Sequence, residues 1–332
     1  MKRILLIATG GTIASKQSEE GLTPLLQPND ILQYVPSILE FCNVDCMQPI
    51  NLDSTNMAPD HWLMIAHEIE KNYDTYDGFV VLHGTDTMSY TAAALSYLIQ
   101  NSVKPIVITG SQRPVDREIT DAILNIKDSF LYACDDQSWG VSIVFQGKVI
   151  VGTRARKTRT KSFNAFSSMD FPSLAVIRND RIIRYIRQNH KEREVHFYHD
   201  LNTKVFLLKL IPGMNPKALS FIEHEYDAII IESFGLGGLP NYHDNELEQV
   251  VKRWIELGKV VLMTTQVPYE GSDMSVYQVG LQYKEKYGLL ESYDMTLEAT
   301  VTKLMWALAE AGNDQKKLEE LYYNPVNYDV IG

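Results

Sequence analysis

Hydroxyl side chains directly follow several strand-length apolar runs in this sequence. The run Ile4–Ile7 leads into "ATGGTIAS", and the run at 78–82 leads into "HGTDT". In an open parallel sheet, ligands bind beyond the carboxyl ends of the strands. The polar residues expected there are those at Thr9 to Thr12, Asp53 to Asn56, His83 to Thr87 and Thr109 to Gln112. They offer hydroxyls, glycine backbone and one prominent carboxylate, Asp86.

A hydroxyl nucleophile needs a base, and no histidine is placed for that task by a known motif. A desolvated lysine can act as the base once it is neutral, and the segment "RARKTRTK" (154–161) supplies lysines. Each signal also has an ordinary structural explanation. Thr12 is suited to cap a helix or turn, Asp86 to cap a helix that begins near Met88, and the basic cluster to form a solvated surface.

Several enzyme classes are disfavoured because their motifs are absent. The chain has no GxGxxG or GK[ST] for a nucleotide, no GxSxG elbow and no HExxH metal motif. Cys42, Cys46 and Cys134 are the only cysteines, and "CNVDC" has the wrong spacing for a zinc site. Their odd number argues against a disulfide framework. We therefore expect neither a metal nor a cofactor.

The composition indicates a soluble protein and disfavours two classes of partner. The 332 residues carry a formal charge of −11, which disfavours nucleic acid or an anionic membrane as partner. Apolar stretches are strand-sized and fall short of the roughly 18 residues of a membrane span. The N-terminus has no long apolar region or convincing cleavage site, so we expect a cytoplasmic protein.

The spacing of apolar residues predicts two α/β domains. Continuous apolar runs alternate with amphipathic stretches, which is typical of parallel strands covered by helices on both faces. Helices are expected at 59–72, 88–101, 244–258 and 297–312. The fold class is α/β, with a larger N-terminal parallel or mixed sheet flanked by helices and a smaller C-terminal α/β domain. The expected boundaries are 1–185, a linker at 186–204, and 205–332.

Taken together, the strand-end motifs resemble those of the bacterial-type L-asparaginase family. The likeness rests on "ATGGTIAS", "DSTNM" (53–57), "HGTDTMSYTAAALS" (83–96) and "TGSQRP" (109–114), and "YDMTLEATVTKLMWAL" (293–308) resembles its cytoplasmic type I branch. The resemblance implies hydrolysis of L-asparagine to L-aspartate and ammonia without metal or cofactor. It also implies weaker use of L-glutamine and assembly as a homodimer or homotetramer.

The resemblance assigns roles to four catalytic residues. Thr12 matches the family's nucleophile, which attacks the side-chain amide and forms a covalent acyl-enzyme. Thr85 and Asp86 match the second threonine and the aspartate of "HGTDT", and Lys157 matches the lysine that completes a proton relay with them. Which threonine attacks first is disputed within the family; we favour Thr12.

The same resemblance implies how the substrate is held. Asp86 is the expected partner of the α-ammonium group, and Asp53, Ser54 and Thr55 match the segment that binds the α-carboxylate. Backbone N–H groups around Gly11 and Gly84, next to the two threonines, are placed to stabilise the oxyanion.

Two departures from the family pattern affect these expectations. Many relatives carry a tyrosine in the flexible loop after the nucleophile, where this chain has Leu22. Some cytoplasmic members bind asparagine at a second, activating site, whose positions hold Arg156, Glu232 and Val267 here. A carboxylate in place of a carboxylate-binding arginine should repel the effector, so we expect little or no activation by asparagine.

Two other functions remain in competition with a free-standing asparaginase. One is the amidase component of a tRNA-dependent amidotransferase, which carries an additional N-terminal domain that we do not expect here. The other is a non-catalytic regulatory protein that binds an amino acid. The glycine-rich segment "ESFGLGGLP" (232–240) fits either a surface that faces a neighbouring subunit's site or a tight turn after a strand.

Overall fold

The computed structural model describes residues 1–18, 21–24, 26–187, 194–240, 242–276, 284 and 287–331, with the backbone alone at 14–18, 21–24, 218 and 242–245. Two compact units make up the chain. The first contains Met1–His199 together with Val326–Tyr328, and the second contains Asp200–Pro325 and Asp329–Gly332. The expected linker at 186–204 spans the division between His199 and Asp200.

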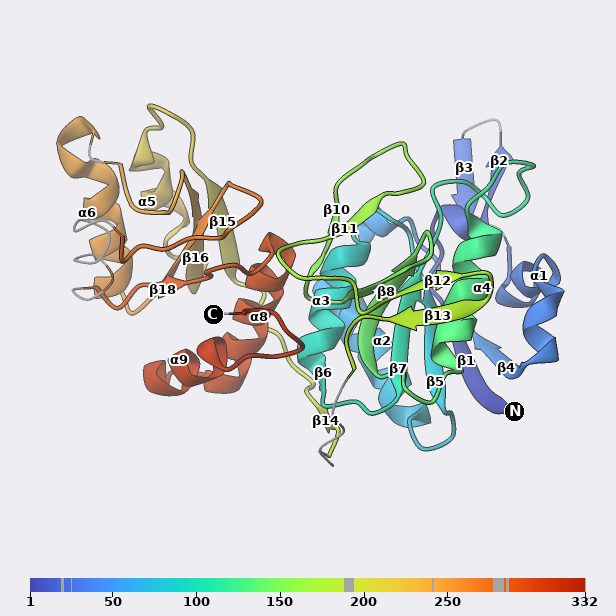
Figure 1. Cartoon of the computed structure of the whole chain (residues 1–332). Coiled ribbons are helices and arrows are strands. Elements are labelled where there is room, and N and C mark those ends of the chain that lie inside the picture. Colours follow the sequence, from blue (N-terminus) through green and yellow to red (C-terminus); the bar gives the residue numbers. More distant parts are fainter. Residues whose placement is uncertain are drawn as a thin grey trace. The chain divides into compact units, whose positions relative to one another are not determined.

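The first unit is built on an eight-stranded mixed sheet (Figure 1). Its strand order is β13-β12-β9-β8-β7-β5-β1-β4, and β4, β1, β5, β7 and β8 run parallel. The strands are β1 (Lys2–Ala8), β4 (Cys42–Met47), β5 (Gly78–Leu82), β7 (Pro105–Thr109), β8 (Gly140–Phe145), β9 (Lys148–Val151), β12 (Ala175–Arg178) and β13 (Arg181–Arg184). Every residue of β5, β7 and β8 is buried, as continuous apolar runs predict for strands covered on both faces.

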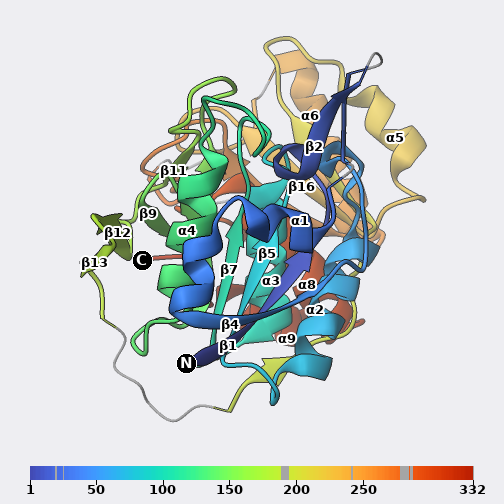
Figure 2. The ribbon, with the colours of Figure 1, turned by 90° about the vertical axis from the view of Figure 1, so that its right-hand side faces the viewer.

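Helices cover both faces of this sheet. Figure 2 shows α1 (Pro28–Gln33) and α4 (Ala122–Ala133) on one face, with α2 (Pro59–Asn72) and α3 (Met88–Leu98) on the other. The predicted helix at 59–72 is confirmed, and its buried residues are Trp62, Ile65, Ala66 and Ile69. The predicted helix at 88–101 is too long, because Ile99–Gln100 form a short strand, β6, that pairs with β14 (His196–Phe197).

Short elements after the strands carry most of the polar residues singled out above. They are the 3-10 helices η1 (Thr12–Ala14), η2 (Pro36–Glu40) and η3 (Ser54–Asn56), the antiparallel pair β2 (Ser15–Ser18) and β3 (Gly21–Pro24), and the antiparallel pair β10 (Ala155–Lys157) and β11 (Phe166–Ser168). Leu22 lies in β3 opposite Gln17, and its side chain is outside the described residues.

The second unit holds a four-stranded parallel sheet, ordered β15-β16-β17-β18. Its strands are β15 (Val205–Lys209), β16 (Ala228–Ser233), β17 (Val260–Thr265) and β18 (Leu290–Glu291), and its helices are η4 (Pro216–Ala218), α5 (Leu219–Ile222), α6 (Tyr242–Glu256), α8 (Leu297–Ala311) and α9 (Gln315–Tyr323). Trp254 and Met263 lie in its core. The predicted two-domain α/β class is thereby confirmed. Over the described residues, no helix combines the length and apolarity that crossing a membrane requires.

Candidate active site

Close backbone contacts at three glycines bring the polar strand ends together. A Cβ atom on Gly11 would lie 2.5 Å from the Gly84 nitrogen, and one on Gly84 would lie 2.5 Å from Ser54 Oγ. A Cβ on Gly10 would lie 2.5 Å from the Leu52 carbonyl oxygen. The segments after β1, β4 and β5 therefore touch through backbone, and any larger residue would push them apart.

Main-chain hydrogen bonds also connect the strand ends at this edge of the sheet. Thr9 N donates to Leu82 O at 3.0 Å, Leu52 N donates to Thr9 O at 3.0 Å, and His83 N donates to Thr109 O at 2.8 Å. The carboxyl ends of β1, β5 and β7 are thus joined to one another. This arrangement is the one expected for a ligand site in an open parallel sheet.

Lys157 meets a hydroxyl and a carboxylate at this edge. Its Nζ lies 2.8 Å from Thr85 Oγ1 and 2.7 Å from Asp86 Oδ1. The Lys157 side chain is 15% exposed and that of Asp86 is 56% exposed. An ion pair this open to water adds little to folding stability. The meeting of an amine, an alcohol and a carboxylate therefore fits a role in proton transfer better than a role in stabilising the fold.

The direction of the Thr85 hydroxyl proton follows from its second neighbour. Thr85 Oγ1 lies 3.2 Å from Gln112 Oε1, and Gln112 Nε2 donates to Ser162 O at 3.1 Å. A main-chain carbonyl only accepts, which fixes the orientation of the Gln112 amide. Thr85 must therefore donate to Gln112 while its oxygen faces the Lys157 amine.

Gln112 is held in turn by a buried acid. Its backbone N–H points at both Asp121 oxygens, at 3.1 and 2.9 Å, and burial raises the pKa of the Asp121 carboxyl. Sequence reasoning placed Gln112 in the strand-end set without giving it a role, and it missed Asp121 and Ser162. Asp121 precedes α4 by one residue, and Ser162 lies five residues beyond Lys157, so neither carried a strand-end signal.

His83 supports the loop that precedes Thr85 through buried hydrogen bonds. It is fully buried, and burial lowers its pKa to about 4. Its Nδ1 lies 2.6 Å from Gly84 O, which only accepts, so Nδ1 carries the proton and Nε2 accepts from Thr91 Oγ1 at 2.8 Å. Trp62 Nε1 donates to the same Thr91 oxygen at 3.0 Å. This buried chain fixes the peptide that precedes Thr85.

The remaining predicted residues lie on the neighbouring segments. Thr12 is half-buried at the start of η1, directly after the Gly11 contact with Gly84. Ser54 is buried, and its Oγ accepts from Asp86 N at 3.3 Å. Asp53 Oδ1 accepts from both the N–H and the hydroxyl of Thr55, each at 2.9 Å.

The three positions of the expected effector site do not lie in one unit. Arg156 is half-buried in β10 of the first unit, whereas Glu232 and Val267 belong to the second. Glu232 is buried and pairs with Lys209 at 3.0 Å, and Val267 is 46% exposed. In the segment 232–240, positive φ angles at Gly235, Gly237 and Gly238 are what a tight turn requires.

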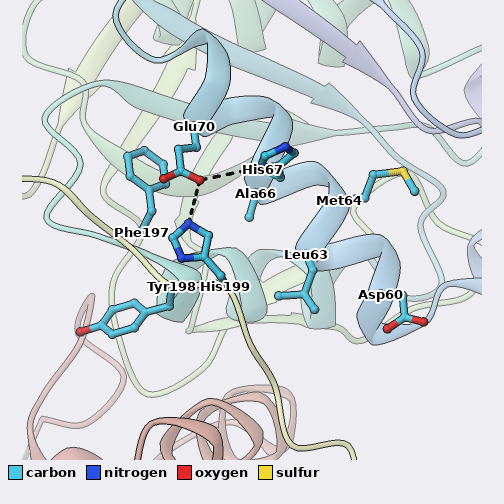
Figure 3. Close-up of a pocket in the computed structure, with 9 residues that line it drawn as sticks. All are labelled: Asp60, Leu63, Met64, Ala66, His67, Glu70, Phe197, Tyr198 and His199. Atoms are coloured by element: carbon cyan, nitrogen blue, oxygen red, sulfur yellow. Dashed lines mark hydrogen bonds and ion pairs between the residues drawn. The ribbon is translucent and has the colours of Figure 1, made fainter.

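A separate cavity of about 300 Å³ lies between α2 and the residues that follow β14 (Figure 3). Its lining residues are Asp60, Leu63, Met64, Ala66, His67, Glu70, Phe197, Tyr198 and His199, and none of the predicted site residues is among them. Figure 3 shows Glu70 turned toward His199, 2.8 Å away. Within the described part of the chain, no group of three His, Cys, Asp or Glu side chains could hold a metal ion.

Comparisons with known proteins give matches along nearly the whole chain. The asparaginase N-terminal family matches residues 3–190, and the glutaminase/asparaginase C-terminal domain matches residues 204–322. L-asparaginase of Thermococcus kodakarensis is 36% identical, with 99% of each chain covered. A glutamyl-tRNA(Gln) amidotransferase subunit of Pyrococcus furiosus is 35% identical, covering 96% of this chain and 74% of that protein.

Solved structures show the same similarity. The thermostable L-asparaginase of Thermococcus kodakarensis has a TM-score of 0.93 at 34% identity, with 99% of each chain covered. A probable cytoplasmic L-asparaginase from Campylobacter jejuni has a TM-score of 0.83 at 26% identity, covering 97% of this chain and 99% of that one. L-asparaginase I from Vibrio cholerae has a TM-score of 0.82 at 27% identity, covering 100% and 99%.

Proposed function

The chain belongs to the asparaginase family, and from this premise we propose that it hydrolyses the side-chain amide of L-asparagine to L-aspartate and ammonia. The observation that carries the proposal is the meeting of the Lys157 amine with the Thr85 hydroxyl and the Asp86 carboxylate, at 2.8 and 2.7 Å. Among the alcohols described at this edge of the sheet, Thr85 is the one that contacts an amine, whereas the Thr55 hydroxyl contacts the Asp53 carboxylate.

In the first half of the reaction, Thr12 Oγ1 attacks the amide carbon of the substrate. Its proton passes to Thr85, whose own hydroxyl proton turns from Gln112 to the neutral form of the Lys157 amine, and Asp86 stabilises the ammonium that results. The C–N bond then breaks, the leaving nitrogen takes a proton from the relay, and ammonia departs. An aspartyl ester on Thr12 remains.

In the second half, water attacks the ester. The same relay accepts the proton of the water and returns one to Thr12, which releases L-aspartate. Backbone N–H groups next to Gly11 and Gly84 stabilise the tetrahedral oxyanion, a contribution of about 3 kcal/mol per donor in comparable enzymes. The contact between Gly11 and Gly84 supports this role, because it keeps both backbones at one point.

The zwitterionic substrate is held by opposite groups at its two ends. The α-ammonium binds Asp86, whose carboxylate is 56% exposed and therefore accessible. The α-carboxylate binds at Asp53–Thr55, where the hydroxyls of Ser54 and Thr55 supply donors. L-Glutamine is a weaker substrate in this proposal, since one extra methylene is discriminated by only about 1–3 kcal/mol.

The remaining expectations stay part of the proposal. They are apolar closure at Leu22, little or no activation by asparagine, a homodimer or homotetramer, and a cytoplasmic location. The similarity to a probable cytoplasmic L-asparaginase supports the location. The pairing of the buried Glu232 with Lys209 supports the absence of the effector site. A carboxylate at this position cannot bind the carboxylate of a second asparagine.

A second candidate is the amidase activity of a tRNA-dependent amidotransferase, favoured by the 35% identity to the glutamyl-tRNA(Gln) amidotransferase subunit of Pyrococcus furiosus. Both candidates use the same amide chemistry, so substrate preference separates them. A free-standing asparaginase releases ammonia from L-asparagine alone in solution, whereas the amidase of an amidotransferase requires its partner and an acylated tRNA.

Ammonia release from L-asparagine by the purified protein and by Thr12→Ala tests the proposal. The wild type should turn over at a rate of about 1–10³ per second, and Thr12→Ala should be slower by at least about 10³-fold. Thr158→Ala is the matched control, because that exposed threonine follows Lys157 and its hydroxyl contacts only Ser167 and Arg159 among the bonds described. Equal rates for wild type and Thr12→Ala would remove Thr12 from the mechanism.

A further inference from the structure

The chain returns to the first unit at Val326–Tyr328, and this returning segment contacts the residues just before Lys157. Thr153 Oγ1 donates to Asn327 O at 2.6 Å, and Arg154 Nε donates to Tyr328 O at 2.5 Å. Both Thr153 and Arg154 are 0% exposed. Two buried donors from one stretch of chain therefore end on the main chain of the returning segment.

The returning segment is itself held firmly. Asn327 Nδ2 donates to Ser96 Oγ at 3.0 Å and to Val141 O at 3.2 Å. The Tyr328 ring stacks on Phe171, with centroids 5.0 Å apart. Asn327 and Tyr328 have φ angles of 49° and 59°, a backbone region that costs other residues than glycine about 1 kcal/mol or more. Such a conformation persists where surrounding contacts over-determine it.

The opposite side of the same stretch packs on α3. A Cβ atom at Gly152 would lie 2.7 Å from Ser96 Oγ and 2.8 Å from Ala92 O. Gly152 is thus packed closely against α3, while Thr153 and Arg154 bond to the returning segment. Ser96 takes part on both sides, because it also accepts from Asn327.

Lys157 lies three residues beyond Arg154, at the end of a short strand. β10 has three residues and pairs only with the three residues of β11 among the described strands. A two-stranded element of that length does not hold its position in water by itself. The position of the Lys157 amine therefore depends on the position of Arg154, the residue that directly precedes β10.

We propose that the returning segment positions Lys157 for catalysis by fixing Thr153 and Arg154. The proposal rests on the function proposed above. Asn327 and Tyr328 are positioning residues, since they bond to Thr153 and Arg154, which directly precede β10, and not to the substrate. They lie 170 and 171 positions beyond Lys157 in the sequence.

The consequence for the reaction is a loss of turnover without a loss of substrate affinity. A misplacement of about 1 Å in a catalytic group costs up to about 10²-fold in rate. The side-chain hydrogen bonds described for the proposed α-carboxylate segment Asp53–Thr55 lie within that segment or run to Asp86 and Thr87, and none involves β10. A looser β10 should therefore lower kcat and leave KM unchanged.

The decisive variants are Thr153→Val, which removes the hydroxyl, and Thr153→Ser, which keeps it. Thr153→Val should lower kcat by about 10-fold or more with KM within about 2-fold, and Thr153→Ser should restore most of the rate. Tyr73→Phe is the matched control, because it removes one buried hydrogen bond of the same unit, to Ser102 Oγ at 2.9 Å, next to the start of β7. It should lose stability with kcat within about 2-fold of wild type.

A second readout does not require asparagine hydrolysis. The rate at which an N-hydroxysuccinimide ester acylates Lys157, followed by peptide mass spectrometry, reports how firmly the amine is held. Thr153→Val should raise this rate several-fold, while Tyr73→Phe and Thr153→Ser leave it unchanged. If the wild type fails to hydrolyse asparagine, the proposed function fails, and the labelling comparison still decides the positioning.

Asn327→Gly provides an independent variant if Thr153→Val folds poorly. Glycine accepts the φ angle of 49° without strain, so this change removes only the bonds to Ser96 and Val141. It should reproduce the fall in kcat and the faster labelling of Lys157. Unchanged kcat, or unchanged Lys157 labelling, in the folded variant overturns the proposal.

Discussion

The two sheets of this chain end in similar residues and use them differently. In the second unit, Ser233 Oγ donates to Gly238 O, Thr265 Oγ1 donates to Gly235 O, and Ser292 Oγ donates to Thr264 Oγ1. These hydroxyls stabilise turns. In the first unit, the Thr85 oxygen instead faces the amine of Lys157.

The lysine–carboxylate pairs of the two sheets differ in the same way. Lys209 pairs with Glu232 at 3.0 Å with its side chain 59% exposed, whereas Lys157 pairs with Asp86 at 2.7 Å and is 15% exposed. Lys157 also contacts the Thr85 hydroxyl, whereas the bond described for Lys209 goes to Glu232. The comparison teaches that similar strand-end residues differ in their partners: at the proposed site, close backbone contacts and Gln112 set the Thr85 oxygen beside an amine.

Removing each lysine should give the largest contrast. Lys157→Met should lower kcat for ammonia release by about 10³-fold, because it removes the proton acceptor of the relay. Lys209→Met removes the lysine–carboxylate pair at the other sheet and should leave kcat within about 2-fold, since the bond described for Lys209 goes to Glu232 and not to a relay residue. Steady-state assays of both purified variants test this. Similar losses of kcat in the two variants would contradict a special role for Lys157.

The buried histidine below the site should make the first unit sensitive to acid. The His83 pKa, lowered to about 4 from an ordinary value of 6.5, means that the unfolded chain binds this proton first as pH falls. Stability is complete above pH 6.5 and declines towards pH 4, by up to about 3 kcal/mol from this group.

Hydrogen exchange of the β5 and β7 amides at pH 7 and pH 4.5 measures that loss. His83→Gln should remove most of the difference between the two pH values. The amides of β16 and β17 in the second unit serve as internal reference, because no histidine of that unit is buried among the described residues. An equal pH dependence for wild type and His83→Gln would contradict the assignment of a neutral, buried imidazole.

Glycine-to-alanine changes separate close approach from simple turn geometry. Gly11→Ala places a methyl group 2.5 Å from the Gly84 nitrogen and should lower kcat by about 10²-fold, because the two threonine-bearing segments must part. Gly238→Ala meets no atom within 4 Å and carries only its backbone strain, with φ of 107°. Its kcat should stay within about 2-fold. A mild effect of Gly11→Ala would show that the approach of the two segments is not needed for turnover.

Removing one hydroxyl at each sheet should separate an effect on stability from an effect on turnover. Ser233→Ala removes a buried bond and should lower the free energy of unfolding by about 1 kcal/mol without changing kcat. Thr85→Val should do the reverse, with little effect on stability and a large loss of kcat. Thermal unfolding and ammonia release on both variants give the four values. A loss of stability in both variants, with activity retained in both, would contradict the proposed difference between the hydroxyls of the two sheets.

The sequence predicted the elements well where one periodicity decided them. The apolar spacing of 59–72 predicted α2 with its four buried residues, and continuous apolar runs predicted the parallel strands. The end of α3 was wrong, because Ile99 and Gln100 pair with His196 and Phe197, a partner that a local pattern cannot reveal. The two sheets themselves look alike at this level.

Side-chain roles were less accessible because their partners lie far along the chain. The basic cluster 154–161 has the composition of a solvated surface, and Lys161 is indeed exposed. Arg154 is fully buried against Tyr328, 174 positions away. Gln112 and Asp121 act through hydrogen bonds that no motif spacing encodes. The catalytic set stays a prediction from the resemblance to a family; of its members, the structure places Lys157 beside Thr85 and Asp86.

The most direct test of the central claim is whether Thr85 and Lys157 act as one relay. Ammonia release should be measured for Thr85→Val, Lys157→Met and the double variant at saturating L-asparagine. Residues that act as a unit give non-additive losses, so the double variant should be no slower than the slower single variant within about 3-fold. A double-variant loss equal to the product of the two single losses would contradict a shared relay.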